Sequence, residues 1–135
     1  MPATLKLDIV TPEAVTFSGD VEMVTLPAVE GEMGVYPQHV PLMTQLVPGE
    51  LIVRRDGHDT YMAVGDGFVE VTADHVAVLT DMAIPADQID EAKAEEARRR
   101  AEARLAGQMD DEETATVHAA LANSMALLAV KRRRK

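Results

Sequence analysis

Residues 76–85, VAVLTDMAIP, are followed at once by residues 86–100, ADQIDEAKAEEARRR. The first stretch is β-branched and apolar and ends in a proline, a composition typical of a strand and the turn after it. The second stretch is rich in Ala, Glu and Arg, which favour a helix. The chain therefore changes from strand-forming to helix-forming sequence at Pro85.

The same boundary divides the turn-forming residues of the whole chain. All seven prolines, all four aromatic residues and seven of the eight glycines lie before residue 86, and only Gly107 lies beyond it. Because proline and glycine mark turns, turns are dense before the boundary and sparse after it. We predict an all-β N-terminal domain over residues 1–84, a flattened β-sandwich or barrel of about eight to ten short strands. A two-helix antiparallel hairpin is predicted over residues 85–135.

Short runs in which apolar and polar residues alternate predict the strands of the first domain. Asp56-Gly57 is a favoured two-residue hairpin turn, and we predict strand ends at Ser18-Gly19-Asp20 and at Pro27. No segment of helical length separates the runs, which excludes a parallel sheet with helical crossovers. The clearest runs are residues 5–9, 21–26, 51–55, 61–64, 68–72 and 76–80, the last being the expected final strand.

The first predicted helix has Asp87 as its N-cap and Gly107 just beyond its end. Its apolar stripe consists mainly of alanines, which bury little area. Its charged residues are spaced for ion pairs one turn apart, each worth about 0.3 kcal/mol. These pairs are Glu95–Arg99, Glu96–Arg100 and Arg98–Glu102.

The second predicted helix begins at Asp110, with Glu113 placed for a capping box. Its apolar stripe consists of Val117, Leu121, Met125 and Leu128. Because both stripes are thin, the hairpin must lean on the β domain or on another protein. Two docked states then need to differ by only a few kcal/mol. Residues 83–86, between the two domains, are the expected hinge.

The charge of the chain is unevenly distributed. Residues 1–86 carry the whole net charge of −10, whereas residues 87–135 are balanced and end in five basic residues, 131–135. An acidic body argues against binding to nucleic acid, because phosphate contacts need a basic surface. The absence of cysteine excludes disulfides and thiolate metal sites. No apolar run reaches the roughly 18 residues of a membrane span, so we expect a soluble protein.

Nothing in the sequence indicates catalysis. The four histidines, at positions 39, 58, 75 and 118, show no spacing typical of metal ligands. No nucleophile motif, phosphate-binding loop or zinc-protease motif occurs. We expect no catalytic residue and no metal site.

Residues 30–42, EGEMGVYPQHVPL, differ from ordinary strand and turn sequence. They predict a stiff loop in which Gly31 and Gly34 take positive φ and the prolines hold a corner. The segment resembles the E-G-E-x-G-x-x-P-x-H-x-P signature of the ε subunit of bacterial and chloroplast rotary (F-type) ATP synthases. Four more segments resemble motifs of that family, in the same order: LVPGEL (46–51), GFVEV (67–71), VAVLTD (76–81) and IDEAKA (89–94).

The resemblance implies a non-catalytic rotor subunit of the central stalk. The sandwich would bind the γ subunit and sit on the ring of membrane c subunits. The hairpin would either fold onto the sandwich or extend along γ into the α/β catalytic head, where it inhibits ATP hydrolysis. The protein would then lie peripherally, as part of the complex, on the cytoplasmic face of the cell membrane.

The resemblance also assigns roles to two groups of residues. Glu32 falls in the loop that faces the c ring in this family, with Glu30, Gly31 and His39 nearby in the same motif. The basic tail would complement an acidic segment of the β subunit. Its residues are Lys131, Arg132, Arg133, Arg134 and Lys135.

Some members of the family bind ATP through an I/L-D-x-x-R-A motif at the start of the first helix. The corresponding residues here are Ile89, Asp90, Lys93 and Ala94, with Arg100 at a further basic position. Lysine in place of arginine keeps the charge but loses the planar fork. Asn123 and Leu127 stand where arginines of the second helix would help. We expect weak regulatory binding of ATP or none, and no other cofactor.

Two alternatives stay open. The chain could be a stand-alone β-sandwich module that binds a small ligand and carries a helical tail. It could also be an ε subunit whose hairpin is locked and purely structural.

Overall fold

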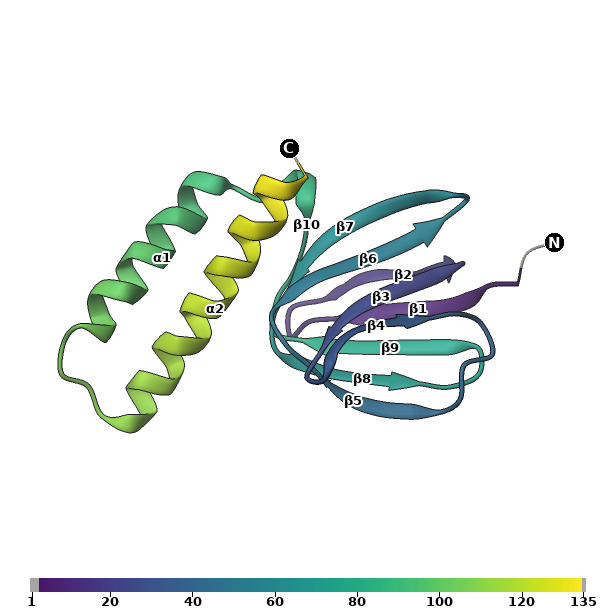
Figure 1. Ribbon diagram of the computed structural model, residues 1–135, viewed down its shortest axis with the longest axis horizontal. Coiled ribbons are helices and arrows are strands. Elements are labelled where there is room, and N and C mark those ends of the chain that lie inside the picture. The colour runs from purple at the N-terminus through teal and green to yellow at the C-terminus, as the bar shows by residue number, and fades with distance from the viewer. Residues whose placement is uncertain (1–2, 135) are drawn as a thin grey trace.

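The computed structural model describes residues 3–134, in which ten strands precede a 3-10 helix and two α-helices. The strands form a flattened sandwich, and the helices form an antiparallel hairpin beside one end of it (Figure 1). The predicted fold class is thus confirmed. The elements are β1 (Leu5–Val10), β2 (Val15–Val21), β3 (Met23–Ala28), β4 (Gly31–Val35), β5 (Leu42–Leu46), β6 (Gly49–Arg55), β7 (His58–Val64), β8 (Gly67–Val71), β9 (His75–Thr80), β10 (Ala83–Pro85), η1 (Ala86–Gln88), α1 (Glu91–Leu105) and α2 (Asp111–Arg133).

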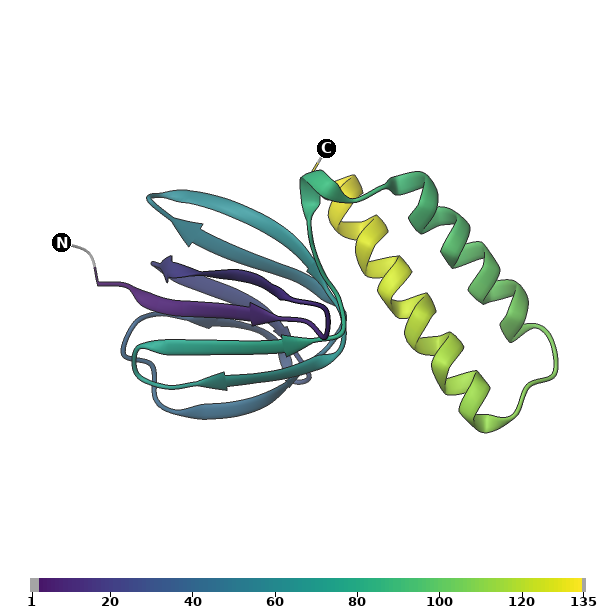
Figure 2. The ribbon, with the colours of Figure 1, turned by 180° about the vertical axis from the view of Figure 1, so that it is seen from behind.

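The strands are hydrogen-bonded in the order β10-β7-β6-β3-β5-β8-β9-β1-β2, with β4 paired to β3. β1 and β9 run parallel, and the other described pairs are antiparallel. The β3–β4, β5–β6, β7–β8 and β9–β10 connections therefore gather at one end, here called the hairpin end because the helices lie against it (Figure 2). Backbone hydrogen bonds join these connections, among them those from Val47 to Pro27, from Gly65 to Met82 and from Asp81 to Asp66.

The core of the sandwich follows from alternation along the strands. Leu5, Leu7 and Ile9 of β1 are buried whereas Lys6 is exposed, as expected for a strand with one face toward the core. Valines and leucines dominate this core, and the two phenylalanines contribute little because Phe17 is half-buried and Phe68 is exposed. The buried members are Leu5, Leu7, Ile9, Val21, Val24, Leu26, Val35, Leu46, Leu51, Val53, Met62, Val64, Val69, Val71, Val76 and Val78.

The predicted final strand, residues 76–80, is followed by a further strand, β10, and two predicted strand ends are also wrong. β2 continues through Gly19 and Asp20, which pair with β1. β3 continues through Pro27, which lies where the neighbour of β3 changes from β6 to β5, a position that tolerates a missing N–H. The predicted turn at Asp56-Gly57 is confirmed, with φ of 52° and 76° at its two residues.

Residues 30–42 are more regular than predicted. Their first part forms β4, which pairs with β3 over residues 31–35. Gly31 has the expected positive φ of 121°, but Gly34 does not, because it lies within the strand. The prediction was therefore right for Gly31 and wrong for Gly34.

The first helix begins later than predicted. Asp90, not Asp87, is its N-cap, and the Asp90 carboxylate accepts a hydrogen bond of 3.1 Å from the backbone N–H of Lys93. Asp87 lies in η1, and Ile89 is extended, with ψ of 126°. The helix is delayed because the Ile89 side chain is buried against the sandwich and α2.

The second helix begins as predicted. Asp110 accepts a hydrogen bond of 2.7 Å from the N–H of Glu113. The buried stripe differs from the predicted one, because Leu121 is only half-buried and Met125 is 54% exposed. Val117 and Leu128 are buried as predicted, together with Ser124, Ala126 and Val130. The three predicted ion pairs along α1 are all present.

Candidate functional site

The candidate functional site is the contact between the helical hairpin and the hairpin end of the sandwich. In both ribbon views α2 lies between α1 and the strands (Figures 1 and 2). A small apolar cluster anchors it, built from Ala63 on β7, Ile89 before α1 and Val130 on α2. Half-buried apolar residues, among them Ile84 and Leu127, pack around these three. This cluster is far smaller than the core of the sandwich.

The basic tail is held against the sandwich by one carboxylate. Arg134 donates to both Glu50 carboxylate oxygens, from Nε at 3.0 Å and from Nη2 at 2.8 Å, and Arg133 donates to Oε1 at 3.1 Å. The guanidinium of Arg134 also lies 3.7 Å from the ring centroid of Tyr61. The hydrogen bond to Glu50 raises the pKa of Arg134 above its usual value. Residue 134 is thereby fixed by two interactions on neighbouring strands, β6 and β7.

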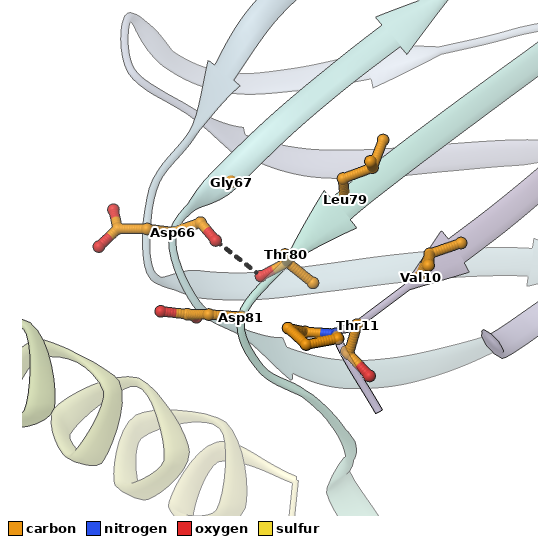
Figure 3. A pocket seen from close by; sticks show the side chains of 8 residues that line it. Val10, Thr11, Asp66, Gly67, Leu79, Thr80 and Asp81 are labelled. Atoms are coloured by element: carbon orange, nitrogen blue, oxygen red, sulfur yellow. Dashed lines mark hydrogen bonds between the residues drawn. The ribbon is translucent and has the colours of Figure 1, made fainter. Parts of the chain in front are cut away.

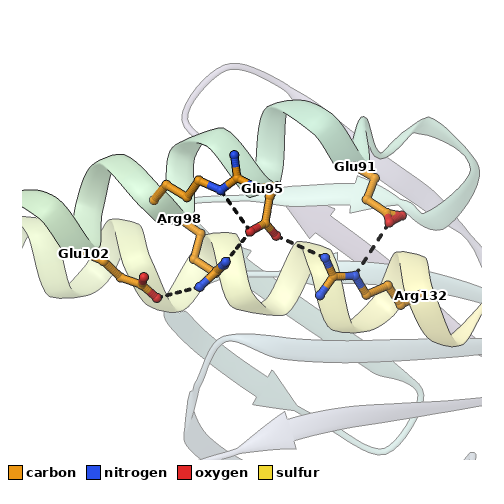
Figure 4. Close-up of polar contacts among 6 residues, drawn as sticks. Glu91, Glu95, Arg98, Glu102 and Arg132 are labelled. Carbon is orange, nitrogen blue, oxygen red and sulfur yellow. Dashed lines mark hydrogen bonds and ion pairs between the residues drawn. The ribbon is translucent and has the colours of Figure 1, made fainter.

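The rest of the tail contacts α1. Arg132 donates to Glu95 at 3.1 Å and lies 3.6 Å from a carboxylate oxygen of Glu91 (Figure 4). Glu95 is shared with Arg98, and hydrogen bonding first from Arg98 and then from Arg132 lowers the pKa of its carboxyl. Lys131 donates to the carbonyl oxygen of Ala86 at 3.5 Å. Lys135, the last residue of the predicted tail site, lies outside the described residues.

Gly65, in the β7–β8 connection, lies close to polar side chains of the β9–β10 connection and of α2. A Cβ built on Gly65 would overlap the Asp81 carboxylate and lie 2.9 Å from Oδ1 of Asn123 on α2. The buried glycine therefore lets the helix approach the β7–β8 and β9–β10 connections closely. Oδ1 of Asn123 is buried and has no hydrogen-bond partner, the single such side-chain nitrogen or oxygen among the described residues.

Four of the five residues predicted to bind nucleotide line one pocket. Ile89, Asp90, Lys93 and Ala94 border a space of about 400 Å³ between α1 and the Leu127 side chain of α2. Arg100 does not belong to it and instead pairs with Glu96 at 2.7 Å on the exposed face of α1. The pocket thus offers one lysine as a cation, with an aspartate beside it.

The residues predicted to face the c ring are divided between the two ends of the sandwich. Glu30 lies in the β3–β4 turn at the hairpin end, and Gly31 and Glu32 follow it as the first residues of β4, all three exposed. His39 lies beyond β4, at the opposite end, where the N–H of the neighbouring Gln38 donates to Ala73 in the β8–β9 turn. The sequence motif therefore does not make a single surface.

A second pocket, of about 370 Å³, lies where β1, β8 and β9 meet the hairpin end (Figure 3). Val10 and Leu79 form its apolar side, and the carboxylates of Asp66 and Asp81 point away from them (Figure 3). The Thr80 hydroxyl donates to the Asp66 carbonyl oxygen at 3.0 Å, which fixes the turn.

The sequence prediction missed the partners of the basic tail. Glu50 and Tyr61 occupy ordinary strand positions, so only their placement beside residue 134 distinguishes them. The available signal was that an acidic sandwich precedes a basic end of the chain. No group of three or more His, Asp or Glu side chains suited to a metal ion occurs among residues 3–134. Within the same residues, no helix is both long and apolar enough to span a membrane.

Two family models match the chain. The model described as "ATP synthase, Delta/Epsilon chain, beta-sandwich domain" matches residues 4–86, and the model described as "ATP synthase, Delta/Epsilon chain, long alpha-helix domain" matches residues 87–132. Among curated relatives, the ATP synthase epsilon chain of Chromobacterium violaceum is 45% identical over 92% of this chain and 90% of its own length. That of Laribacter hongkongensis is 43% identical over 93% of this chain and 91% of its own length.

Solved structures agree with these relatives. One of them contains OSCP, F1 and the c-ring of the Euglena gracilis mitochondrial ATP synthase. A chain of that structure superposes with a TM-score of 0.79 at 28% identity, and the match covers 96% of this chain and 82% of that one. A chain of the Tetrahymena thermophila central stalk and c-ring has the same fold, with a TM-score of 0.66 at 14% identity over 98% of each chain. By these matches, the chain belongs to the delta/epsilon family of ATP synthase subunits.

Proposed function

We propose that this accessory, non-catalytic subunit of the central stalk couples the γ subunit to the c ring and inhibits ATP hydrolysis through its C-terminal hairpin. The observation that carries the inhibitory part is the small contact between hairpin and sandwich. Ala63, Ile89 and Val130 are its buried apolar members, so leaving the sandwich exposes little apolar surface. A hairpin attached in this way can exchange between docked and extended states separated by a few kcal/mol.

The coupling role is supported by apolar side chains on the outer face of the sandwich. Met43 on β5, Phe68 on β8 and Leu79 on β9 are 68%, 61% and 53% exposed. Phe68 and Leu79 are register partners and thus lie side by side. Exposed apolar patches mark protein contacts, and we assign this one to γ.

The c-ring contact is assigned to the exposed β3–β4 turn, which carries Glu30, and to Glu32 at the start of β4. His39 is left out of that contact because it lies at the other end of the sandwich. The subunit would lie at the cytoplasmic face of the cell membrane, held there through the complex.

ATP is assigned at most a weak regulatory role. Within residues 3–134, the pocket beside Lys93 has no second cation among its lining residues, because Arg100 is engaged with Glu96 and residue 127 is a leucine. A nucleotide triphosphate needs several donors to bind tightly, so the pocket favours weak binding.

The decisive experiment measures ATP hydrolysis by the assembled catalytic head with γ and either the full chain or residues 1–86. We expect faster hydrolysis with the truncated chain, since it lacks the inhibitory hairpin. Equal rates, with both forms shown to bind γ, would refute inhibition.

The contribution of the tail is measured with a chain in which residues 131–135 are replaced by glutamine, so that helix length is kept. Hydrolysis should increase in this variant, most clearly at low salt, because exposed charge pairs are screened by ions. A variant with the same five residues all lysine serves as the matched control and should inhibit nearly as well as the natural tail.

A further inference from the structure

We propose that Glu50 is a latch: it holds the hairpin in the docked state by forming ion pairs with the basic tail. The regulatory consequence of this latch depends on the proposed inhibitory function, whereas the latch itself is a property of the isolated chain. It consists of the Glu50 carboxylate, the guanidinium groups of Arg133 and Arg134, and the Tyr61 ring.

The geometry of the latch is that of a strong ion pair. Arg134 approaches Glu50 with two parallel N–H donors, at 3.0 and 2.8 Å, and Arg133 adds a third at 3.1 Å. A forked contact between guanidinium and carboxylate is stronger and more directional than a single charged hydrogen bond. Two arginines on one carboxylate leave that site with excess positive charge, so the loss of Glu50 would leave two guanidinium groups in mutual repulsion.

The latch is also partly shielded from water. The Glu50 side chain is 10% exposed and that of Arg134 is 27% exposed, whereas the side chains of the exposed pair Arg100 and Glu96 are each 68% exposed. Tyr61 covers the guanidinium of Arg134 at 3.7 Å and adds a cation–π contact. Ionic screening therefore weakens this pair less than the exposed Arg100–Glu96 pair.

In the docked state, each described arginine of the tail is paired with a carboxylate of the same chain. Arg132 is bound to Glu95, while Arg133 and Arg134 are bound to Glu50. An acidic surface on another subunit can bind these side chains only after they leave their internal partners. The sandwich therefore competes with any acidic partner for the same charges, and Glu50 is the competing group that lies farthest from the tail in sequence.

The test measures docking in the isolated full chain. Since the chain has no cysteine, His58→Cys beside the β6–β7 turn and Ala103→Cys on α1, both at exposed positions, introduce two specific sites for a fluorescent pair. Glu50→Gln should decrease the ratio of docked to undocked molecules roughly tenfold, the effect of losing one charged hydrogen-bond network. Arg134→Gln should produce a similar decrease. The matched control is Glu13→Gln in the exposed β1–β2 loop, which should change nothing.

A charge exchange separates the ion pair from general damage. Glu50→Arg combined with Arg134→Glu should recover at least part of the docking lost in either single variant. If Glu50→Gln does not fold, Arg134→Gln still tests the latch, because residue 134 lies beyond the last strand. Docking that is unchanged in both single variants, or a double variant no better than the worse single one, would overturn the proposal.

Hydrolysis by the assembled head distinguishes the latch from the proposed function. Glu50→Gln should strengthen inhibition, because it frees the tail without changing it, whereas neutralising the tail should weaken inhibition. A shift in docking with no change in inhibition would leave the latch in place and refute the inhibitory function.

Discussion

Replacing Val130 with alanine should loosen the hairpin without destabilising the sandwich. Val130 is 1% exposed and, with Ala63 and Ile89, forms the buried part of the interface. The change removes two buried methyl groups, worth about 1.6 kcal/mol at about 0.8 kcal/mol each. The cavity left behind raises the cost to about 2 kcal/mol, because the neighbours relax only partly. The ratio of docked to undocked hairpins should therefore fall about 30-fold.

Val78 provides the matched control, because it is also fully buried but lies in the core of the sandwich on β9. Val78→Ala removes the same atoms, so it should cost the sandwich a similar free energy and lower its midpoint of thermal unfolding by roughly 10 °C. Val130→Ala should leave that midpoint within a few degrees of the parent.

The two variants are compared by two measurements. Calorimetry reports the thermal stability of the sandwich, and the fluorescence distance between the β6–β7 turn and α1 reports whether the hairpin is docked. The expected result is that each variant affects one readout and spares the other. Equal losses of thermal stability in both variants would refute the reasoning, since hairpin and sandwich would then unfold as a single cooperative unit.

Three further predictions concern the sandwich and the pocket. Gly67→Ala should destabilise the sandwich by about 1–3 kcal/mol or more, measured by urea unfolding, because a Cβ there would overlap the carbonyl group of Leu79. The pKa of Asp8 is lowered in the folded protein, mainly by the hydrogen bond from Ser18. The ionised carboxylate therefore stabilises the fold at any pH above the unfolded pKa of 3.8, and this stabilisation is lost as the pH falls through the lower pKa of the folded state. Acid titration should thus show a smaller loss of stability for Asp8→Asn than for the parent, and an equal loss would contradict the assignment. Calorimetric titration with ATP should show no micromolar binding, because Lys93 is the one cation that lines the pocket in the described part of the chain. Micromolar affinity would show the assignment of weak binding to be wrong.

The sequence was sufficient for the features that depend on local chemistry. Asp110 caps α2 and Asp56-Gly57 forms the β6–β7 turn as predicted, because each depends on its own side chain or backbone freedom. The start of α1 was wrong by three residues because burial of Ile89 fixes an extended backbone there. Local propensity does not contain that information.

The candidate site was less predictable than the fold. The tail was identified as a binding element, but its partner Glu50 lies 84 positions away in the sequence. No pattern along the chain connects the two residues, and only the packing of α2 against β6 and β7 brings them together. The motif containing Glu32 and His39 shows the opposite problem, since neighbours in sequence lie at opposite ends of a strand.

Strand β10 bears on what the subunit would expose in the proposed movement of its hairpin. Its three residues pair with residues 62–64 of β7 and close the hydrogen-bonding edge of the sheet at that point. An open edge is a template for association with other chains. Movement about the extended residues Ile89 and Asp90 would keep β10 in place, whereas a hinge at residues 83–86 would strip it from the sheet. A pivot beyond β10 would thus let the subunit change shape without exposing this edge to association with other chains.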